Sequence, residues 1–213
     1  MRSHLVLLGD SIFDNGAYTR GAADVVTHLR RMLPSEWQVT LCAVDGATAA
    51  ELPAQLRRVP DDASHLAISI GGNDALQNSD LLAMRVTSTT EALELFADRL
   101  ATFEQTYRNT IREAMALKCE TVVCTVYNGA LEPDRATIAR VALALFNDVI
   151  LRAAIDFGLD AVELRSICSE PGDYANAIEP SGQGGLKIAG ALARAIGATH
   201  EAVMKPARMW GHG

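Results

Sequence analysis

The stretch that decides the fold lies near the amino terminus and reads Leu5-Val6-Leu7-Leu8-Gly9-Asp10-Ser11. Its four apolar residues form a short continuous run, which is typical of a strand buried on both faces. Glycine then permits a sharp turn. Ser11 is therefore predicted at the carboxyl edge of a sheet, where open α/β sheets bind ligands. It is a candidate nucleophile, although Gly-Asp-Ser is also ordinary turn composition.

Strand-like and helix-like segments alternate along the rest of the chain. Short segments rich in Val, Ile and Leu predict strands at His4–Leu8, Gln38–Val44, Leu66–Ile70, Thr121–Tyr127 and Ala161–Leu164. Helical patterns follow at Ala22–Leu33, Ala47–Arg58, Glu91–Leu117, Arg135–Phe157 and Gly182–Ile196. We expect Asp134 to cap the fourth of these helices and Gly158 to end it.

Strict alternation of this kind predicts an α/β fold, a three-layer α/β/α sandwich around a five-stranded parallel sheet. No linker or repeat divides residues 1–213, so we expect one domain, with a frayed tail over 206–213. Residues 74–90 show no clean period and are expected to form a loop or lid over the ligand edge. The apolar residues of this segment, which would cover an acyl chain, are Leu76, Leu81, Leu82 and Met84.

Composition limits the function classes. The chain has 213 residues, 49% of them hydrophobic and 21% charged, as in soluble globular proteins. Its net charge of −7 and scattered basic residues argue against nucleic-acid binding. No signal peptide or membrane span is evident, so a cytoplasmic location without membrane insertion is expected. The cysteines lack the spacing of a metal or redox motif and are interpreted as structural thiols: Cys42, Cys119, Cys124 and Cys168.

The ends of the first three predicted strands carry polar groups with a shared chemical use. Ser11 follows the first strand, Gly46 the second and Asn73 the third. Attack by a serine on an ester carbonyl develops negative charge on oxygen, which N–H donors stabilise. The backbone amides of Ser11 and Gly46 and the side-chain amide of Asn73 would supply three such donors. We expect Gly46 to allow close approach because it has no Cβ.

At this point the chain resembles the SGNH, or GDSL-type, hydrolase superfamily. The blocks that carry the resemblance are Gly9-Asp10-Ser11-Ile12-Phe13-Asp14-Asn15, Asp45-Gly46-Ala47-Thr48 and Ile70-Gly71-Gly72-Asn73-Asp74. The resemblance implies a flavodoxin-like sheet of order 2-1-3-4-5, and ester hydrolysis without a metal or organic cofactor. It also implies that Ser11 is the nucleophile and that Gly46 and Asn73 are oxyanion-hole donors. The expected partner is a small-molecule ester.

The resemblance breaks at the family's fourth element, an Asp-x-x-His pair before the last helix. Here Asn176 stands in the place of the aspartate and Glu179 in that of the histidine. In one interpretation, Glu179 is the general base, with a pKa raised by burial, and Asn176 or Asp173 orients it. In a second, a histidine from elsewhere reaches the serine; His200 and His212 are placed better for this than His4, His28 and His65. In a third, the pocket binds without catalysis.

Several further residues are predicted to support the site. Asp10 and Asp14 flank Ser11 and either fix its loop or serve ordinary turn chemistry. Asn15 is a substrate contact or a cap, and Asp74 braces the loop of Asn73. Tyr127 and Asn128 end the fourth predicted strand and are expected to line the pocket wall.

Two other function classes compete with an esterase. One is a non-catalytic module of the same fold that binds an acylated or glycosylated small molecule. The other is a nucleotide-binding regulator of flavodoxin-like type, which the acidic and bulky residues after Ser11 make a poorer fit.

Overall fold

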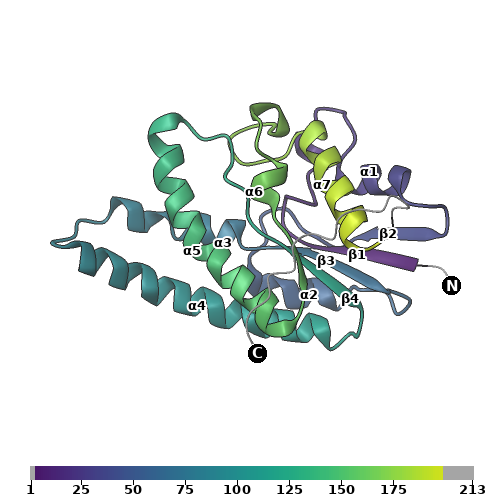
Figure 1. Ribbon diagram of the computed structural model, residues 1–213, viewed down its shortest axis with the longest axis horizontal. Coiled ribbons are helices and arrows are strands. Elements are labelled where there is room, and N and C mark those ends of the chain that lie inside the picture. Colours follow the sequence, from purple (N-terminus) through teal and green to yellow (C-terminus); the bar gives the residue numbers. More distant parts are fainter. Residues whose placement is uncertain (1–2, 199–213) are drawn as a thin grey trace.

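Residues 3–198 are described by the computed structural model, and their centre is a parallel sheet of strand order β2-β1-β3-β4-β5 (Figure 1). The strands are β1 (Ser3–Gly9), β2 (Trp37–Leu41), β3 (His65–Ser69), β4 (Glu120–Cys124) and β5 (Asp160–Val162). The predicted α/β fold and its strand order are therefore confirmed. The predicted tail over 206–213 lies outside the described residues.

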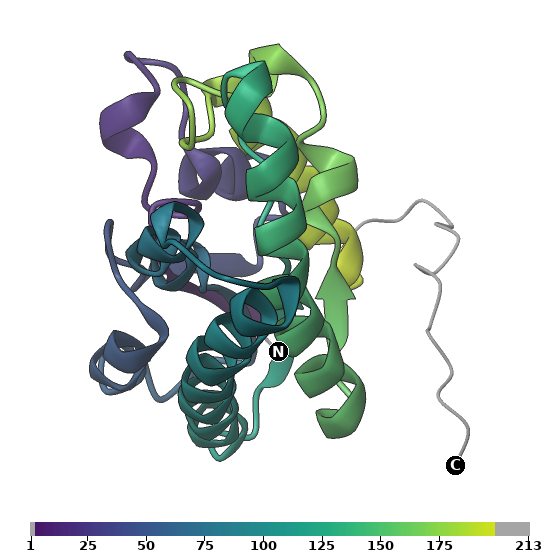
Figure 2. The same cartoon turned by 90° about the vertical axis from the view of Figure 1, so that its left-hand side faces the viewer.

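Helices cover both faces of the sheet, as Figures 1 and 2 show from two sides. The α-helices are α1 (Val25–Met32), α2 (Leu52–Leu56), α3 (Gly72–Gln77), α4 (Thr89–Met115), α5 (Pro133–Phe157), α6 (Leu164–Ile167) and α7 (Gly182–Ala195). Short 3-10 helices are η1 (Gly16–Tyr18), η2 (Ala49–Glu51), η3 (Ser79–Ala83) and η4 (Pro171–Asp173).

The packing of strand β1 explains why its residues are apolar on both faces of the sheet. Leu5 and Leu7 pack into the core under α1 and α7, while Val6 and Leu8 pack into the core under α2, α4 and α5. All four side chains are fully buried. Successive residues of a strand point to opposite faces, so a strand covered on both sides needs a continuous apolar run.

Strand β3 ends one residue before its predicted limit, and β2, β4 and β5 end two or three residues before theirs, where local hydrogen bonds replace the ladder. After Leu41, the amides of Cys42 and Ala43 both donate to the Leu7 carbonyl, at 2.8 and 2.9 Å. Beyond Cys124, the Asn147 side chain pairs with both backbone groups of Val126, at 2.7 and 2.8 Å. After β5, α6 begins at Leu164, with Glu163 as its N-cap.

The helix predictions need three corrections. The predicted helix over 47–58 is η2 followed by the short α2, and a capping box between Thr48 and Glu51 starts it. The predicted loop over 74–90 is largely α3 and η3. Helix α5 takes Glu132 as its N-cap rather than Asp134, because Pro133 suits the first helical position. Gly158 does end this helix, at φ +67°.

Candidate functional site

The loops after β1, β2 and β3 are tied together by side chains of the predicted site. The Asn73 side-chain amide donates to the Ala47 carbonyl at 3.0 Å. The Asp74 carboxylate accepts from the Ala49 amide at 3.0 Å, so it braces the loop after β2 as well as its own. The Asp14 carboxylate accepts from the Asp45 amide at 3.1 Å, which joins the first loop to the second.

Gly9 sets the path of the first loop. It has φ +129°, and a Cβ there would stand 1.8 Å from the Ser69 carbonyl oxygen. Its backbone amide and carbonyl both bond to the Gln55 side chain at 2.8 Å. Sequence reasoning missed this clamp, because nothing in the pattern distinguishes Gln55 from other polar residues of its helix.

Ser11 and Glu179 meet in one cavity although 168 positions separate them along the chain. The exposed fractions are 9% for Ser11 and 6% for Glu179. Burial raises the pKa of Glu179 above its ordinary value, and the polar Ser11 hydroxyl beside it acts in the opposite direction. Nearby Asp45 raises this pKa further. Glu179 Oε2 is buried and has no hydrogen-bond partner within residues 3–198.

Three other side chains hold the segment that carries Glu179. The side-chain oxygen of Asn176 accepts from the backbone amides of Ile178 and Glu179, both at 2.9 Å. Tyr127 donates from its hydroxyl to the Ile178 carbonyl at 2.6 Å. Asn15 donates to the Pro180 carbonyl at 3.2 Å and accepts from the Val25 amide at 3.0 Å. The backbone around Glu179 is thus fixed from α1, from the first loop and from the loop after β4.

Neither Asn176 nor Asp173 forms a hydrogen bond with the Glu179 carboxyl, so the direct contact expected of an orienting side chain is not observed. Asn176 acts through its oxygen on backbone amides, because the tight turn presents those amides to it. Asp173 is fully buried and accepts from Lys187 Nζ at 2.7 Å. Its other partners are the Glu170 amide and the Gln183 side chain, so it holds η4 against α7.

Asp10 is a second buried carboxyl beside the serine. Its exposed fraction is 2%, and its Oδ1 accepts from the Ile12 amide at 3.1 Å. Burial raises the pKa of Asp10 to about 7, and the neighbouring carboxyls of Glu179 and Asp74 add to the rise. The site therefore holds two carboxyls whose pKa values are raised by burial.

The cavity measures about 140 Å³. Its polar walls include the predicted residues Asp10, Ser11, Asn73, Tyr127, Asn128 and Glu179. Asn128 Oδ1 is buried there without a partner among the described residues. Its apolar lining residues are Ile12, Leu76, Leu82, Phe96, Val126, Leu131, Leu143, Phe146 and Ile178, with Ala75, Ala139 and Ala142. Sequence reasoning missed the contribution of α4 and α5, because their apolar faces also fit ordinary core packing.

Five predicted residues are not part of the cavity lining: Asp14, Asn15, Gly46, Asp74 and Asn176. Asn15 is fully buried in its bridge to Pro180, so it does not face a substrate space. Gly46 has φ +81°, and a Cβ there would meet no atom within 4 Å. Glycine is therefore favoured at position 46 by the positive φ of its backbone. It is not required there to make room for another part of the chain.

Two of the four predicted lid residues line the cavity and two do not. Leu76 and Leu82 line it from α3 and η3. Leu81 is buried under η3, and Met84 is exposed, because the 3-10 turn points successive side chains in different directions. This segment forms a wall of helical structure on the cavity.

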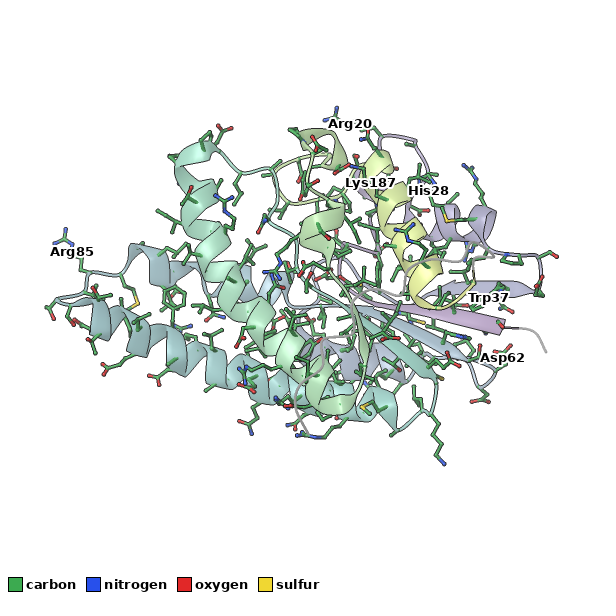
Figure 3. All side chains as sticks on the ribbon, in the orientation of Figure 1. Arg20, His28, Trp37, Asp62, Arg85 and Lys187 are labelled. Atoms are coloured by element: carbon green, nitrogen blue, oxygen red, sulfur yellow. The ribbon has the colours of Figure 1, made fainter. Side chains whose placement is uncertain are left out.

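The histidines within residues 3–198 are engaged away from Ser11, and none of them lines the cavity. His4 lies 2.9 Å from the Asp62 carboxylate, and His65 contacts the Ser64 hydroxyl at 2.8 Å. His28 on α1 contacts the Gly182 carbonyl at 3.0 Å, close to α7 (Figure 3). His200 and His212 lie outside the described residues.

Two further features of residues 3–198 bear on the site. Their His, Cys, Asp and Glu side chains form no group of three or more that suits a metal ion. No helix in this part of the chain is both long enough and apolar enough to cross a lipid bilayer.

Comparison with known proteins identifies relatives by sequence model and by structure. The model of the GDSL-like Lipase/Acylhydrolase family matches residues 7–184. No curated protein matches the sequence.

Similar solved structures share the fold at low identity. Phospholipase A1 from Streptomyces albidoflavus NA297 is 17% identical, with a TM-score of 0.69 over 92% of this chain and 100% of that chain. An extracellular lipase from Streptomyces rimosus is 18% identical, with a TM-score of 0.62 over 91% and 99%. A variant of Axe2, an acetyl xylan esterase from Geobacillus stearothermophilus, is 21% identical, with a TM-score of 0.66 over 97% of each chain. Since the family model spans most of the sequence, from β1 to the start of α7, the chain belongs to the GDSL-like lipase/acylhydrolase family.

Proposed function

We propose that the protein hydrolyses small-molecule carboxylic esters through an acyl-enzyme on Ser11, with Glu179 as the general base. One observation carries this proposal: the Ser11 hydroxyl and the buried Glu179 carboxyl line the same cavity, where the hydroxyl is close enough to affect the pKa of the carboxyl. Family membership supports ester chemistry, and the named lipases and esterases share the fold. Glu179 would occupy the place that a histidine usually has in the family.

The acylation step follows from this placement. Ser11 Oγ attacks the ester carbonyl carbon, and its proton passes to the Glu179 carboxylate. A hydroxyl needs such a base within hydrogen-bond reach. Burial strengthens Glu179 in this role, because its raised pKa makes the carboxylate a better proton acceptor than an exposed glutamate.

The charge that develops on the carbonyl oxygen needs N–H donors. The Asn73 side-chain amide donates one N–H to the Ala47 carbonyl, and this bond fixes the orientation of the amide. Its second N–H remains available to the substrate. The backbone amides of Ser11 and Gly46 are the other proposed donors. A fixed donor costs little reorganisation during the reaction, which is why such groups stabilise the transition state strongly.

The tetrahedral intermediate then collapses. The alcohol leaves and takes the proton back from Glu179, and the acyl group stays on Ser11. A water molecule then reacts in the same way: Glu179 accepts its proton while its oxygen attacks the acyl carbon. The second tetrahedral intermediate collapses, Ser11 Oγ leaves and takes the proton back from Glu179, and the free acid is released.

Hydrolysis of 4-nitrophenyl acetate by the purified full chain tests the proposal. We expect nitrophenol release from the wild type and none above background from Ser11→Ala. A matched control is Ser79→Ala, which removes a hydroxyl from η3 at the edge of the same cavity and is expected to leave release measurable. Equal rates in the wild type and Ser11→Ala would contradict the proposal.

The second candidate is a binding module of the same fold that performs no hydrolysis, and the carboxyl in the histidine's place favours it. A fluorophosphonate probe separates the two. A nucleophilic Ser11 displaces fluoride and becomes covalently labelled, and Ser11→Ala is not labelled. An unlabelled wild type that still binds the intact ester supports the binding module.

A further inference from the structure

The cavity beside Ser11 is lined by polar and by apolar side chains. Ser11, Asn73 and Glu179 are among the polar ones. The apolar ones include Leu76 of α3, Leu82 of η3, Phe96 of α4, and Leu143 and Phe146 of α5. Figure 1 shows that α4 and α5 diverge toward their amino-terminal halves, which carry Phe96 and Leu143.

The direction of the reaction places the two halves of an ester in this cavity. Glu179 must return a proton to the leaving alcohol, so the alcohol lies on the side of Glu179. The acyl group then points away from Glu179, toward the walls supplied by α3, α4 and α5. Of the apolar lining residues, only Ile178 belongs to the segment of Glu179.

The size of the cavity limits the acyl group. An apolar protein cavity of about 150 Å³ accommodates benzene, which has six carbons. The cavity here measures about 140 Å³ and has a comparable lining of leucine and phenylalanine side chains. It is larger than an acetyl group fills, and an unfilled apolar space loses the contacts that stabilise the bound ester.

From these observations we infer that the substrates are esters of medium-length aliphatic acids, with an acyl chain of up to about six carbons held between α3, α4 and α5. This inference rests on the proposed function, since it uses Glu179 to orient the ester. It assigns acyl-chain selectivity to Phe96, Ala142 and Leu143, which no catalytic step uses.

The test is a chain-length series of 4-nitrophenyl esters from acetate to decanoate. We expect kcat/KM to rise about fourfold with each methylene up to the hexanoate, and to level or fall at the decanoate. Ala142→Trp places a large side chain among the apolar lining residues of α5 and is expected to lower the hexanoate-to-acetate ratio of kcat/KM at least about tenfold. The matched control is Ala144→Trp, which adds the same group at an exposed position of α5 outside the cavity, and should keep the wild-type ratio.

A binding measurement separates this inference from the proposed hydrolysis. The Ser11→Ala variant is titrated calorimetrically with N-methylhexanamide and N-methylacetamide, which imitate the acyl halves. Tighter binding of the hexanamide supports the acyl site even if the wild type hydrolyses no ester, in which case only the hydrolysis fails. Equal binding of the two amides, or equal ratios in Ala142→Trp and Ala144→Trp, overturns the acyl site while leaving an observed hydrolysis intact.

Discussion

The side-chain oxygen of Asn176 accepts a hydrogen bond from the backbone amide of Glu179 at 2.9 Å. It also accepts from the amide of Ile178 at 2.9 Å, so one oxygen fixes two consecutive peptide groups. The Glu179 carboxyl is thereby aimed by its own backbone, and no described side chain bonds to its Oε2. The turn over residues 176–179 therefore holds the Glu179 carboxyl in a fixed position.

The first prediction tests whether Asn176 positions Glu179 through these two hydrogen bonds. Asn176→Ala removes both hydrogen bonds and is expected to lower kcat about tenfold with a smaller effect on KM, since each bond contributes about 1 kcal/mol to the turn. Steady-state kinetics with a nitrophenyl ester measure both constants. Asn176→Asp keeps the accepting oxygen and should retain most of kcat at alkaline pH. Equal losses in the two variants would show that the acceptor oxygen is not what matters.

The second prediction concerns the pH dependence of hydrolysis. Only the carboxylate form of Glu179 accepts a proton, so kcat/KM should rise with pH, with its midpoint above the ordinary glutamate pKa of 4.5. Because Asp10 titrates beside it, the apparent midpoint belongs to the pair.

Glu179→Gln should lower kcat/KM by about 100-fold or more at all pH values. A pH series of initial rates measures both effects. The control is Glu94→Gln, at an exposed position of α4 outside the cavity, which should keep the wild-type profile. An unchanged profile in Glu179→Gln would exclude this residue as the base.

The third prediction is a change of stability with pH that depends on Asp10. Its pKa is about 7 in the folded chain against 3.8 for an ordinary aspartate, so the folded state holds the proton more tightly. The resulting stabilisation is complete below pH 3.8 and is lost as pH rises toward 7 and above. Asp10→Asn does not titrate, and its Oδ1 keeps an acceptor for the Ile12 amide.

The free energy of unfolding of Asp10→Asn relative to the wild type should therefore grow by about 1.4 kcal/mol per pH unit between pH 4 and pH 7. Urea unfolding at several pH values measures this slope. A difference between the two proteins that stays constant with pH would contradict the burial of a protonated carboxyl at this position.

The fourth prediction addresses the proposed oxyanion donor. Asn73→Ala removes the side-chain amide and is expected to lower kcat by about 100- to 1,000-fold, the usual cost of one such donor. Part of that loss will come from the bond to Ala47, which also disappears. Asp74→Asn weakens the neighbouring brace on Ala49 without removing the donor, so it should cost stability more than kcat. Comparable kcat losses in both variants would indicate loop disorder as the common cause.

The fold could be predicted from the sequence because apolar residues recur with different periods in strands and in helices. The apolar run in β1 and the three-to-four-residue spacing in α4 arise from burial, which pattern reasoning reads directly. Strand ends were less predictable, because Asn147 and Gln55 end regular pairing by bonding to the backbone of Val126 and Gly9. Such long-range clamps leave no periodic signal.

Some residues of the candidate site could likewise be predicted from the sequence, and others could not. Ser11, Asn73 and Glu179 were predicted from residues close to strand ends, and the structure brings all three to one cavity. The apolar walls from α4 and α5 were not predicted, since Phe96 and Leu143 have the same helical spacing as core residues. The partner of Asp173 was missed because the ion pair of this buried carboxylate with Lys187 depends on how η4 packs on α7.

The last prediction concerns Tyr127, whose hydroxyl holds the Ile178 carbonyl at 2.6 Å. Tyr127→Phe keeps the ring, and with it the edge contact to Tyr174 at 5.2 Å between ring centres, but leaves this carbonyl without its donor. The expected cost is about 1–3 kcal/mol of unfolding free energy. Because Ile178 immediately precedes Glu179, kcat should also fall more than KM rises.

Tyr174→Phe is the matched control, since it removes a hydroxyl that donates to the Cys168 carbonyl at 2.5 Å within the same aromatic pair. It should cost comparable stability in urea unfolding and leave kcat close to that of the wild type, because Cys168 does not adjoin the base. If both variants lose kcat equally, the hydroxyl of Tyr127 stabilises the domain in general. If only Tyr127→Phe loses it, the Tyr127 hydroxyl positions Glu179 for proton transfer from Ser11.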